Sequence, residues 1–371
     1  MVDIKNEFQP DYAVTPGEVL SVELELRSMT QQELAKRTGL TPKHIISILK
    51  AKSAITPETA IKLERALGMP VEYWLNLVAH YQEIRARVAE EAQLERDLEW
   101  LTRLPISTMA KIGWIEKYSD KKQQLIEVLR FFGIASVEQW DDMWPKLNVA
   151  YRQNQTQEVF PEAVSAWLRQ GEIEASRIAC SRYDKEAFRG ALDDVRDLTT
   201  RDPAGFVPVL QERCAMAGVA VVFVPALPKT GVSGATRWLN KDKAIIQLSL
   251  RYKTDDHLWF TFFHEAGHIL LHGKKELFLE GRNGMDQEKE HEANVFAESE
   301  LIPQKCFSQF IAEGNFSKAA ITSFANSVGI SPGIVVGQLQ HRKILNMNFC
   351  NDLKKRFKWA HDLISPAWPC N

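Results

Sequence analysis

The chain has 371 residues, which is too long for one small domain, so two or three domains are expected. Its 45% hydrophobic and 25% charged residues are ordinary for globular proteins, and a net charge of −2 excludes a general attraction to nucleic acid. Five scattered cysteines without a Cys-x-x-Cys pair argue against a cysteine zinc site and favour a reducing compartment. Because neither a signal peptide nor an apolar run of about 20 residues is found, a cytoplasmic protein without a membrane partner is expected.

Two short helices joined by a glycine turn are predicted near the start of the chain. The first begins after Thr30, has Glu33 in position for a capping box, and ends at Gly39. The second begins after Thr41, with Pro42 at its first position. A pair of short helices with this spacing is typical of a helix-turn-helix motif.

A local basic excess indicates what this motif binds. Between Arg27 and Arg65 there are eight positive and three negative side chains, a net charge of +5. If the second helix enters the major groove, these charges lie near phosphates, which predicts DNA as the partner. The alternative is a small protein-interaction bundle with a basic face. The predicted DNA contacts are Gln31 to a phosphate, Thr41, Lys43, His44 and Ser47 to base edges, and Lys50 and Lys52 to the backbone.

Residues 14–88 resemble the DNA-binding domain of HigA-type antitoxins, within the Xre group of phage-repressor-like regulators. The motifs that carry the resemblance are residues 16–20 (PGEVL), 32–35 (QELA) and 72–77 (EYWLNL). The resemblance implies a homodimer that binds a palindromic operator and represses its own operon.

The region from residue 79 to about 202 shows helical periodicity and no chemical motif. Its tryptophans are interpreted as packing anchors. We therefore expect three parts: a helix-turn-helix domain at 1–90, a helical connector at 91–200 and a further domain at 201–371.

The stretch His264-Glu265-Ala266-Gly267-His268 carries the clearest chemical signal. Two histidines four residues apart lie on one face of a helix, so both imidazoles reach one Zn²⁺, and Glu265 is placed to activate a water molecule. The surrounding residues are apolar, which predicts a buried helix, with Asp255 or Asp256 as its N-cap. The alternative is a core helix whose histidines only hydrogen-bond to neighbours, but a carboxylate in such a helix is costly without a charged partner.

A third ligand is expected from the glutamate-rich helix that follows. Its inward face predicts Glu290 as the ligand, with Glu292 as the alternative. Asn294, one turn further on, is expected to hydrogen-bond to a ligand imidazole. His272 is interpreted as a helix-end residue and His291 as a surface residue.

Three short strands are predicted before the histidine helix, at residues 219–224, 233–238 and 244–248. A small sheet that leads into such a helix is the layout of zinc peptidases, and the fold class expected for the chain is α+β, predominantly α. An extended substrate is expected to add a strand beside Ala244–Leu248.

Residues 200–345 resemble the ImmA/IrrE metallopeptidase family. The motifs that carry the resemblance are 264–268 (HEAGH), 290–297 (EHEANVFA), 301–303 (LIP) and 329–337 (GISPGIVVG). The resemblance implies site-specific cleavage of a repressor or similar protein, zinc binding by His264, His268 and Glu290, and Glu265 as the general base. A second oxyanion donor is expected, with Tyr252, Arg251 and His272 as candidates.

Two functions remain open from the sequence. The first is a DNA-binding regulator that cleaves a protein partner. The alternative is an antitoxin-like autorepressor that cleaves nothing, in which the zinc domain is a sensor or a platform for a cognate toxin.

Overall fold

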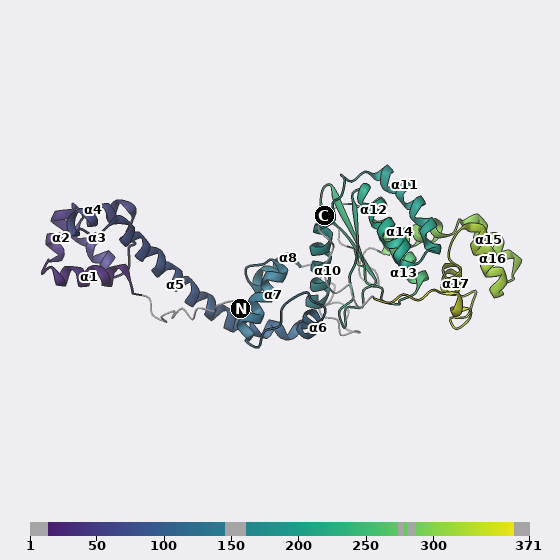
Figure 1. Ribbon diagram of the computed structural model, residues 1–371, viewed down its shortest axis with the longest axis horizontal. Coiled ribbons are helices and arrows are strands. Elements are labelled where there is room, and N and C mark those ends of the chain that lie inside the picture. The colour runs from purple at the N-terminus through teal and green to yellow at the C-terminus, as the bar shows by residue number, and fades with distance from the viewer. Residues whose placement is uncertain (1–13, 145–160, 274–277, 280–286, 360–371) are drawn as a thin grey trace. The chain divides into compact units, whose positions relative to one another are not determined.

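A computed structural model describes residues 14–144, 161–273, 278–279 and 287–359, and it divides the chain into two compact units, Met1–Asp97 and Leu98–Asn371. Helices dominate both units, and the strands form one small sheet in the second unit (Figure 1). The predicted class, α+β and predominantly α, is confirmed.

Five helices make the first unit as far as it is described, from residue 14 on. They are α1 (Pro16–Leu26), α2 (Gln31–Thr38), α3 (Pro42–Leu49), α4 (Pro57–Leu67) and α5 (Val71–Asp97). Their shared core is apolar and closed to solvent; its fully buried members are Leu20, Leu34, Ile45, Ala60, Leu63 and Trp74. The length of α5 beyond this core is mostly exposed.

Local signals explain the bounds of α2 and α3, and the predicted helix-turn-helix is confirmed. The Thr30 hydroxyl accepts a hydrogen bond from the Glu33 N–H at 3.1 Å, and Gly39 ends α2 with φ 68°. The Thr41 hydroxyl caps α3 in the same way. The predicted capping box is not closed, because the Glu33 carboxylate accepts hydrogen bonds from Arg37 instead.

The helices of the second unit fall before and after its sheet. Before it lie η1 (Leu98–Arg103), α6 (Ile106–Lys111), α7 (Lys121–Phe132), α8 (Val137–Met143), α10 (Pro161–Ser176), α11 (Lys185–Arg196), η2 (Asp197–Thr200) and α12 (Pro203–Met216). After the first three strands lies α13 (Asp255–Leu271), and after the short last strand lie α14 (Gln287–Leu301), α15 (Gln304–Glu313), α16 (Lys318–Val328), α17 (Pro332–His341) and η3 (Asn351–Leu353).

The sheet has the strand order β1-β3-β2-β4. Its strands are β1 (Val219–Phe223), β2 (Gly234–Asn240), β3 (Lys243–Leu248) and β4 (Phe278–Leu279). β3 pairs with β1 in parallel and with β2 in antiparallel, and β2 also pairs with β4. The prediction that a substrate adds a strand beside Ala244–Leu248 is therefore wrong, because both edges of β3 are already paired.

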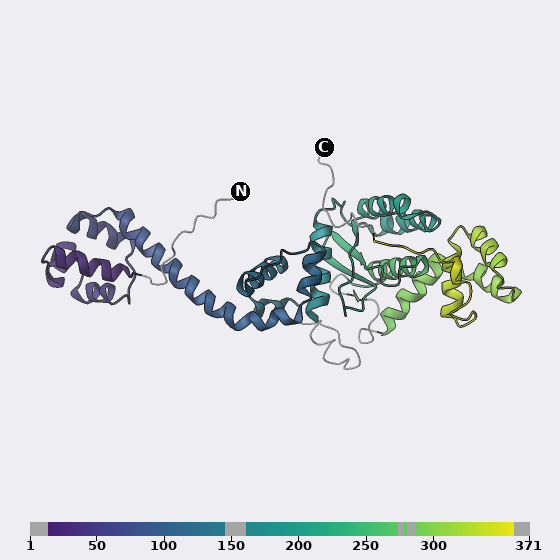
Figure 2. The ribbon, with the colours of Figure 1, turned by 60° about the horizontal axis from the view of Figure 1, so that its bottom comes forward.

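The two faces of the sheet are covered by different helices (Figure 2). Ile246 on β3 belongs to the core that also contains α12 and α13. On the opposite face Gln247 donates a hydrogen bond from Nε2 to the Trp167 carbonyl on α10 at 2.6 Å, and the Trp167 indole N–H donates to the Val224 carbonyl at 3.0 Å. Successive residues of β3 thus alternate between two helix layers, as strand geometry requires. The helix α10 therefore packs against the sheet within the second unit.

The first turn of α13 is held by two later segments of the chain, Ser331 before α17 and Lys354–Lys355 after η3. Neither expected N-cap is correct, because Thr254 occupies the N-cap position. Asp255 is fully buried and accepts hydrogen bonds from the Ser331 hydroxyl at 2.5 Å and from the Lys355 N–H at 3.0 Å. Asp256 forms a buried ion pair with Lys354 at 2.7 Å. Both carboxylates serve tertiary contacts, which a local capping signal does not reveal.

The buried Asp255 makes the stability of the chain depend on pH. Burial, with a smaller contribution from the neighbouring Asp256 charge, raises the pKa of Asp255 to about 6, although its hydrogen bonds oppose the shift. The folded chain therefore holds a proton that the unfolded chain loses near pH 4, so the contribution of this carboxyl to the free energy of unfolding falls as pH rises through that window. We expect Asp255→Asn to gain about 2 kcal/mol relative to the wild type between pH 4.5 and 7. Urea unfolding of both chains at the two pH values measures this difference, and an equal difference at both would contradict it.

Among the described helices, none is both long and apolar enough to cross a membrane by itself. The pair α16 and α17 meets the length and composition criteria only when joined, and the chain bends by 111° between them.

Candidate functional site

The helices α13 and α14 pack closely against each other, and small residues permit this. Gly267 of α13 faces Ala293 of α14, where an added Cβ would lie 3.3 Å from the Ala293 Cα. Ala293 and Ala297 are fully buried at this contact. The close approach brings Glu290 of α14 to the two histidines of α13.

Three ligand atoms converge between the helices. The Nε2 atoms of His264 and His268 lie 3.0 Å apart. The Glu290 carboxylate oxygens lie 3.3 Å from His264 Nε2 and 3.4 Å from His268 Nε2. A tetrahedral zinc ion with bonds of about 2.0–2.1 Å holds its ligand atoms roughly 3.3 Å apart, so both the spacing and the two-nitrogen, one-oxygen donor set fit zinc. Among the described residues these three form the group of side chains able to share a metal ion.

The electrostatics of the group also suit a cation. Burial alone would raise the pKa of Glu290, but hydrogen bonds from His264 and His268 and their charges outweigh it and lower this pKa to about 2. Burial lowers the pKa of His268. An ionised carboxylate is the form that binds a metal ion, and the ion displaces a proton from any charged imidazole that it binds.

The outward nitrogens of both imidazoles have partners. His264 Nδ1 lies 2.9 Å from Asn294 Oδ1, which is the contact expected from the sequence. His268 Nδ1 lies 2.9 Å from His272 Nδ1, and His272 Nε2 lies 2.9 Å from Glu292 Oε2. The Glu292 carboxylate thus binds His272, and it is Glu290 that the structure brings to the converging nitrogens.

Two other sequence interpretations concern histidines near the site. His272 directly follows the last residue of α13, as expected for a helix-end residue, yet its side chain is only 3% exposed. His291 is exposed on α14, as expected. The contact of His272 with His268 was missed, although three histidines at intervals of four share one helix face and could have indicated it.

Glu265 lies in the same buried layer of α13, where its side chain is 0% exposed. A Cβ at Gly234, the first residue of β2, would lie 2.8 Å from Glu265 Oε1. The Thr236 hydroxyl donates to the Glu265 carbonyl at 3.2 Å. The start of β2 therefore passes directly over Glu265, and glycine is required there for space. The sequence signal was a glycine at the beginning of a strand.

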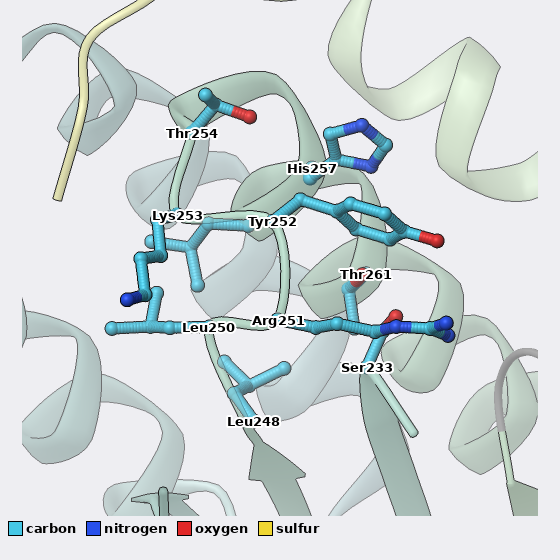
Figure 3. Close-up of a pocket in the computed structure, with 10 residues that line it drawn as sticks. Ser233, Leu248, Leu250, Arg251, Tyr252, Lys253, Thr254, His257 and Thr261 are labelled. Carbon is cyan, nitrogen blue, oxygen red and sulfur yellow. The ribbon is translucent and has the colours of Figure 1, made fainter. Parts of the chain in front are cut away.

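A small pocket adjoins this layer at the loop between β3 and α13 (Figure 3). Thr261, one turn before Glu265, lines the pocket together with Ser233. Tyr252 stacks on His257 with ring centroids 4.1 Å apart. Of the three candidate oxyanion donors, Tyr252 and Arg251 line this pocket, whereas both ring nitrogens of His272 are engaged elsewhere.

The predicted DNA contacts belong to α2, α3 and the residues next to these helices. Ile45 and Ile48 face the core, as expected. The residues left exposed are Gln31, Thr41, Lys43, Lys50 and Lys52, and those left partly exposed are His44 and Ser47. The Ser47 hydroxyl lies 2.7 Å from the Ser53 hydroxyl, and the Thr41 hydroxyl accepts the N-cap hydrogen bond, so these two already have partners within the unit. Ile46 on the same helix is 40% exposed, and no sequence motif had indicated it.

A segment of each unit matches a known protein family. Residues 23–74 match the helix-turn-helix family, and residues 215–339 match the IrrE N-terminal-like domain family.

Three individual relatives each match a quarter of the chain or less. Antitoxin HigA-1 of Vibrio cholerae is 36% identical over 88 residues, which cover 23% of this chain and 83% of that protein. An uncharacterized HTH-type transcriptional regulator of Escherichia coli, YddM, is 34% identical over 62 residues, which cover 17% of this chain and 66% of that protein. A solved structure of antitoxin HigA from Pseudomonas aeruginosa with the higBA promoter is 25% identical, with a TM-score of 0.22, and the match covers 23% of this chain and 95% of that one.

Proposed function

Since this chain belongs to the HigA family of helix-turn-helix proteins and carries an IrrE N-terminal-like domain, we propose that it is a transcriptional regulator whose second unit is a zinc-dependent endopeptidase. Its proposed substrate is a protein partner such as a repressor. The observation that carries the proposal is the convergence of His264, His268 and Glu290, with Glu265 buried beside the first histidine on the same helix.

Each residue of the site has a role in this mechanism. His264, His268 and Glu290 would hold the zinc ion through the two Nε2 atoms and the carboxylate. When bound, zinc supplies Lewis acidity, which lowers the pKa of a water molecule from about 15.7 towards 7. Glu265 accepts a proton from the attacking water and returns it to the leaving amine nitrogen. The buried layer around Glu265 keeps bulk water from this carboxylate, which strengthens its interactions with charge.

The first unit is proposed to bind operator DNA. The probe for this test is the DNA that precedes the protein's own coding sequence. We expect Lys43→Glu combined with Lys50→Glu to weaken this binding at least 100-fold, because two cationic contacts become repulsive. The slope of log affinity against log salt should also fall by about 1–2. Fluorescence anisotropy over a salt series measures both effects.

The matched control carries the same change of charge on another exposed surface of the first unit. Arg85 and Arg96 of α5 lie outside the proposed DNA face, so Arg85→Glu with Arg96→Glu should leave operator affinity nearly unchanged. Equal binding by the Lys43/Lys50 variant and the wild type would instead favour a first unit that binds protein.

A second candidate function is favoured by the relatives named above, one of which is an antitoxin whose match covers 23% of this chain. In this candidate the chain is an autorepressor, and its second unit holds zinc without cleaving anything, as a sensor or a platform for a toxin. Proteins co-purified with the zinc-loaded chain distinguish the two candidates. Time-dependent cleavage of a partner supports the peptidase, and a stable complex with an intact partner supports the platform.

A further inference from the structure

A third histidine and a second glutamate form a chain of contacts behind the proposed zinc ligands. His272 Nδ1 faces His268 Nδ1 at 2.9 Å, and His272 Nε2 faces Glu292 Oε2 at 2.9 Å. The His272 side chain is 3% exposed, whereas the Glu292 side chain is 52% exposed. The contacts thus connect a half-exposed carboxylate to a buried ligand nitrogen through one imidazole.

The direction of each hydrogen bond follows from the chemistry of its two ends. A carboxylate oxygen accepts, so His272 Nε2 donates to Glu292. In a neutral imidazole the other nitrogen is then an acceptor, so His272 Nδ1 accepts from His268 Nδ1. With its proton on Nδ1, His268 carries its lone pair on Nε2, which is the atom that converges with His264 Nε2 and the Glu290 carboxylate.

The two ligand histidines are therefore supported differently. His264 Nδ1 faces the neutral amide oxygen of Asn294. His268 is backed by an imidazole that itself donates to a carboxylate, and such a partner increases the electron density on a ligand nitrogen more than an amide does. Removal of the His272 imidazole should therefore affect zinc binding through His268 and not through His264.

We propose that His272 and Glu292 are positioning residues, which fix the proton of His268 on Nδ1 and present its Nε2 to zinc. This inference rests on the proposed zinc site and adds to it a second layer that the ligand set alone does not include. Glu292 acts only through His272, so the two residues should behave as one unit when either is removed.

The test is a double-mutant cycle on zinc affinity, measured on the full chain by competition with a chelator. His272→Ala is expected to weaken zinc binding about 10- to 100-fold. Glu292→Ala should weaken it in the wild-type background and have no further effect in the His272→Ala background. The absorption spectrum of the Co²⁺-loaded chain should change in both single variants, because the environment of His268 changes.

Controls of the same residue types separate this effect from general destabilisation. His291→Ala on α14 and Glu313→Ala at the end of α15 both remove exposed side chains, and neither should change zinc affinity. Because Glu292 is half exposed, its variant keeps the test valid even if His272→Ala does not fold.

The outcomes distinguish the inference from the proposed function. A wild-type chain that binds no zinc overturns both. A wild-type chain that binds zinc, together with a His272→Ala variant of equal affinity, overturns only the positioning role. An effect of Glu292→Ala that is as large without His272 as with it also overturns that role.

Discussion

Glu265→Gln is expected to reduce proteolysis by about 10³-fold while zinc binding and operator binding stay at wild-type levels. The amide has nearly the same shape as the carboxylate, so it fits the space beneath Gly234, but it cannot accept a proton from water. The substitution also removes a buried charge, so the free energy of unfolding should not fall. Cleavage of the co-purified protein partner, followed by mass spectrometry, measures the effect.

Glu313→Gln, which makes the same chemical change at an exposed position on α15, serves as the control and should cleave normally. Unchanged cleavage by Glu265→Gln would remove Glu265 from the role of general base. Loss of cleavage together with loss of zinc would show that Glu265 supports the site rather than the proton transfer.

Glu290→Gln is expected to weaken zinc binding by about 10²–10³-fold. Three ligands share a binding free energy of roughly 10 kcal/mol, and the substitution removes the anionic one. Glu292→Gln, two residues away on the same helix, should weaken zinc binding tenfold or less, because its carboxylate contacts His272 and not the converging atoms. Isothermal titration of zinc into the three metal-free chains gives the order.

The reverse order of these two variants would make Glu292 the ligand and remove Glu290 from the site. Equal, small effects from both would mean that the two histidines hold zinc without a carboxylate from α14. The wild-type chain is the reference for these zinc affinities, and Glu313→Gln is the control, which should bind zinc as the wild type does.

The parts of the structure that local sequence signals determine were predictable. Thr30, Gly39 and Thr41 define α2 and α3 because a capping hydroxyl or a left-handed glycine acts within one turn of the helix. The spacing of His264 and His268 fixes their common face by helix geometry alone. The contact of Asn294 with His264 followed from the inward face of α14 once that helix was expected to pack on α13.

The parts that depend on non-local packing were not predictable in the same way. The central place of β3 follows from the parallel pairing of β1, and nothing within Ala244–Leu248 reveals whether its edges are paired. Asp255 carried a capping signal, but Ser331 and the Lys355 backbone, far along the chain, bind its carboxylate. The position of Gly234 over Glu265 likewise depends on how the sheet lies on α13.

The choice between Glu290 and Glu292 as the third ligand also depends on packing that the sequence does not show. Glu290 and Glu292 are two residues apart on one helix, and the sequence left either as the third ligand. The side-chain direction separates them, since one carboxylate reaches His264 and His268 and the other reaches His272. His272 was placed correctly at the end of α13, but its buried contact required the partner helix.

An anomalous difference map at the zinc absorption edge, from crystals of the full chain grown with zinc, tests the central claim most directly. We expect one strong peak in the second unit, within bonding distance of His264 Nε2, His268 Nε2 and the Glu290 carboxylate. A map without a peak between α13 and α14, or with a peak bonded to other residues, would contradict it.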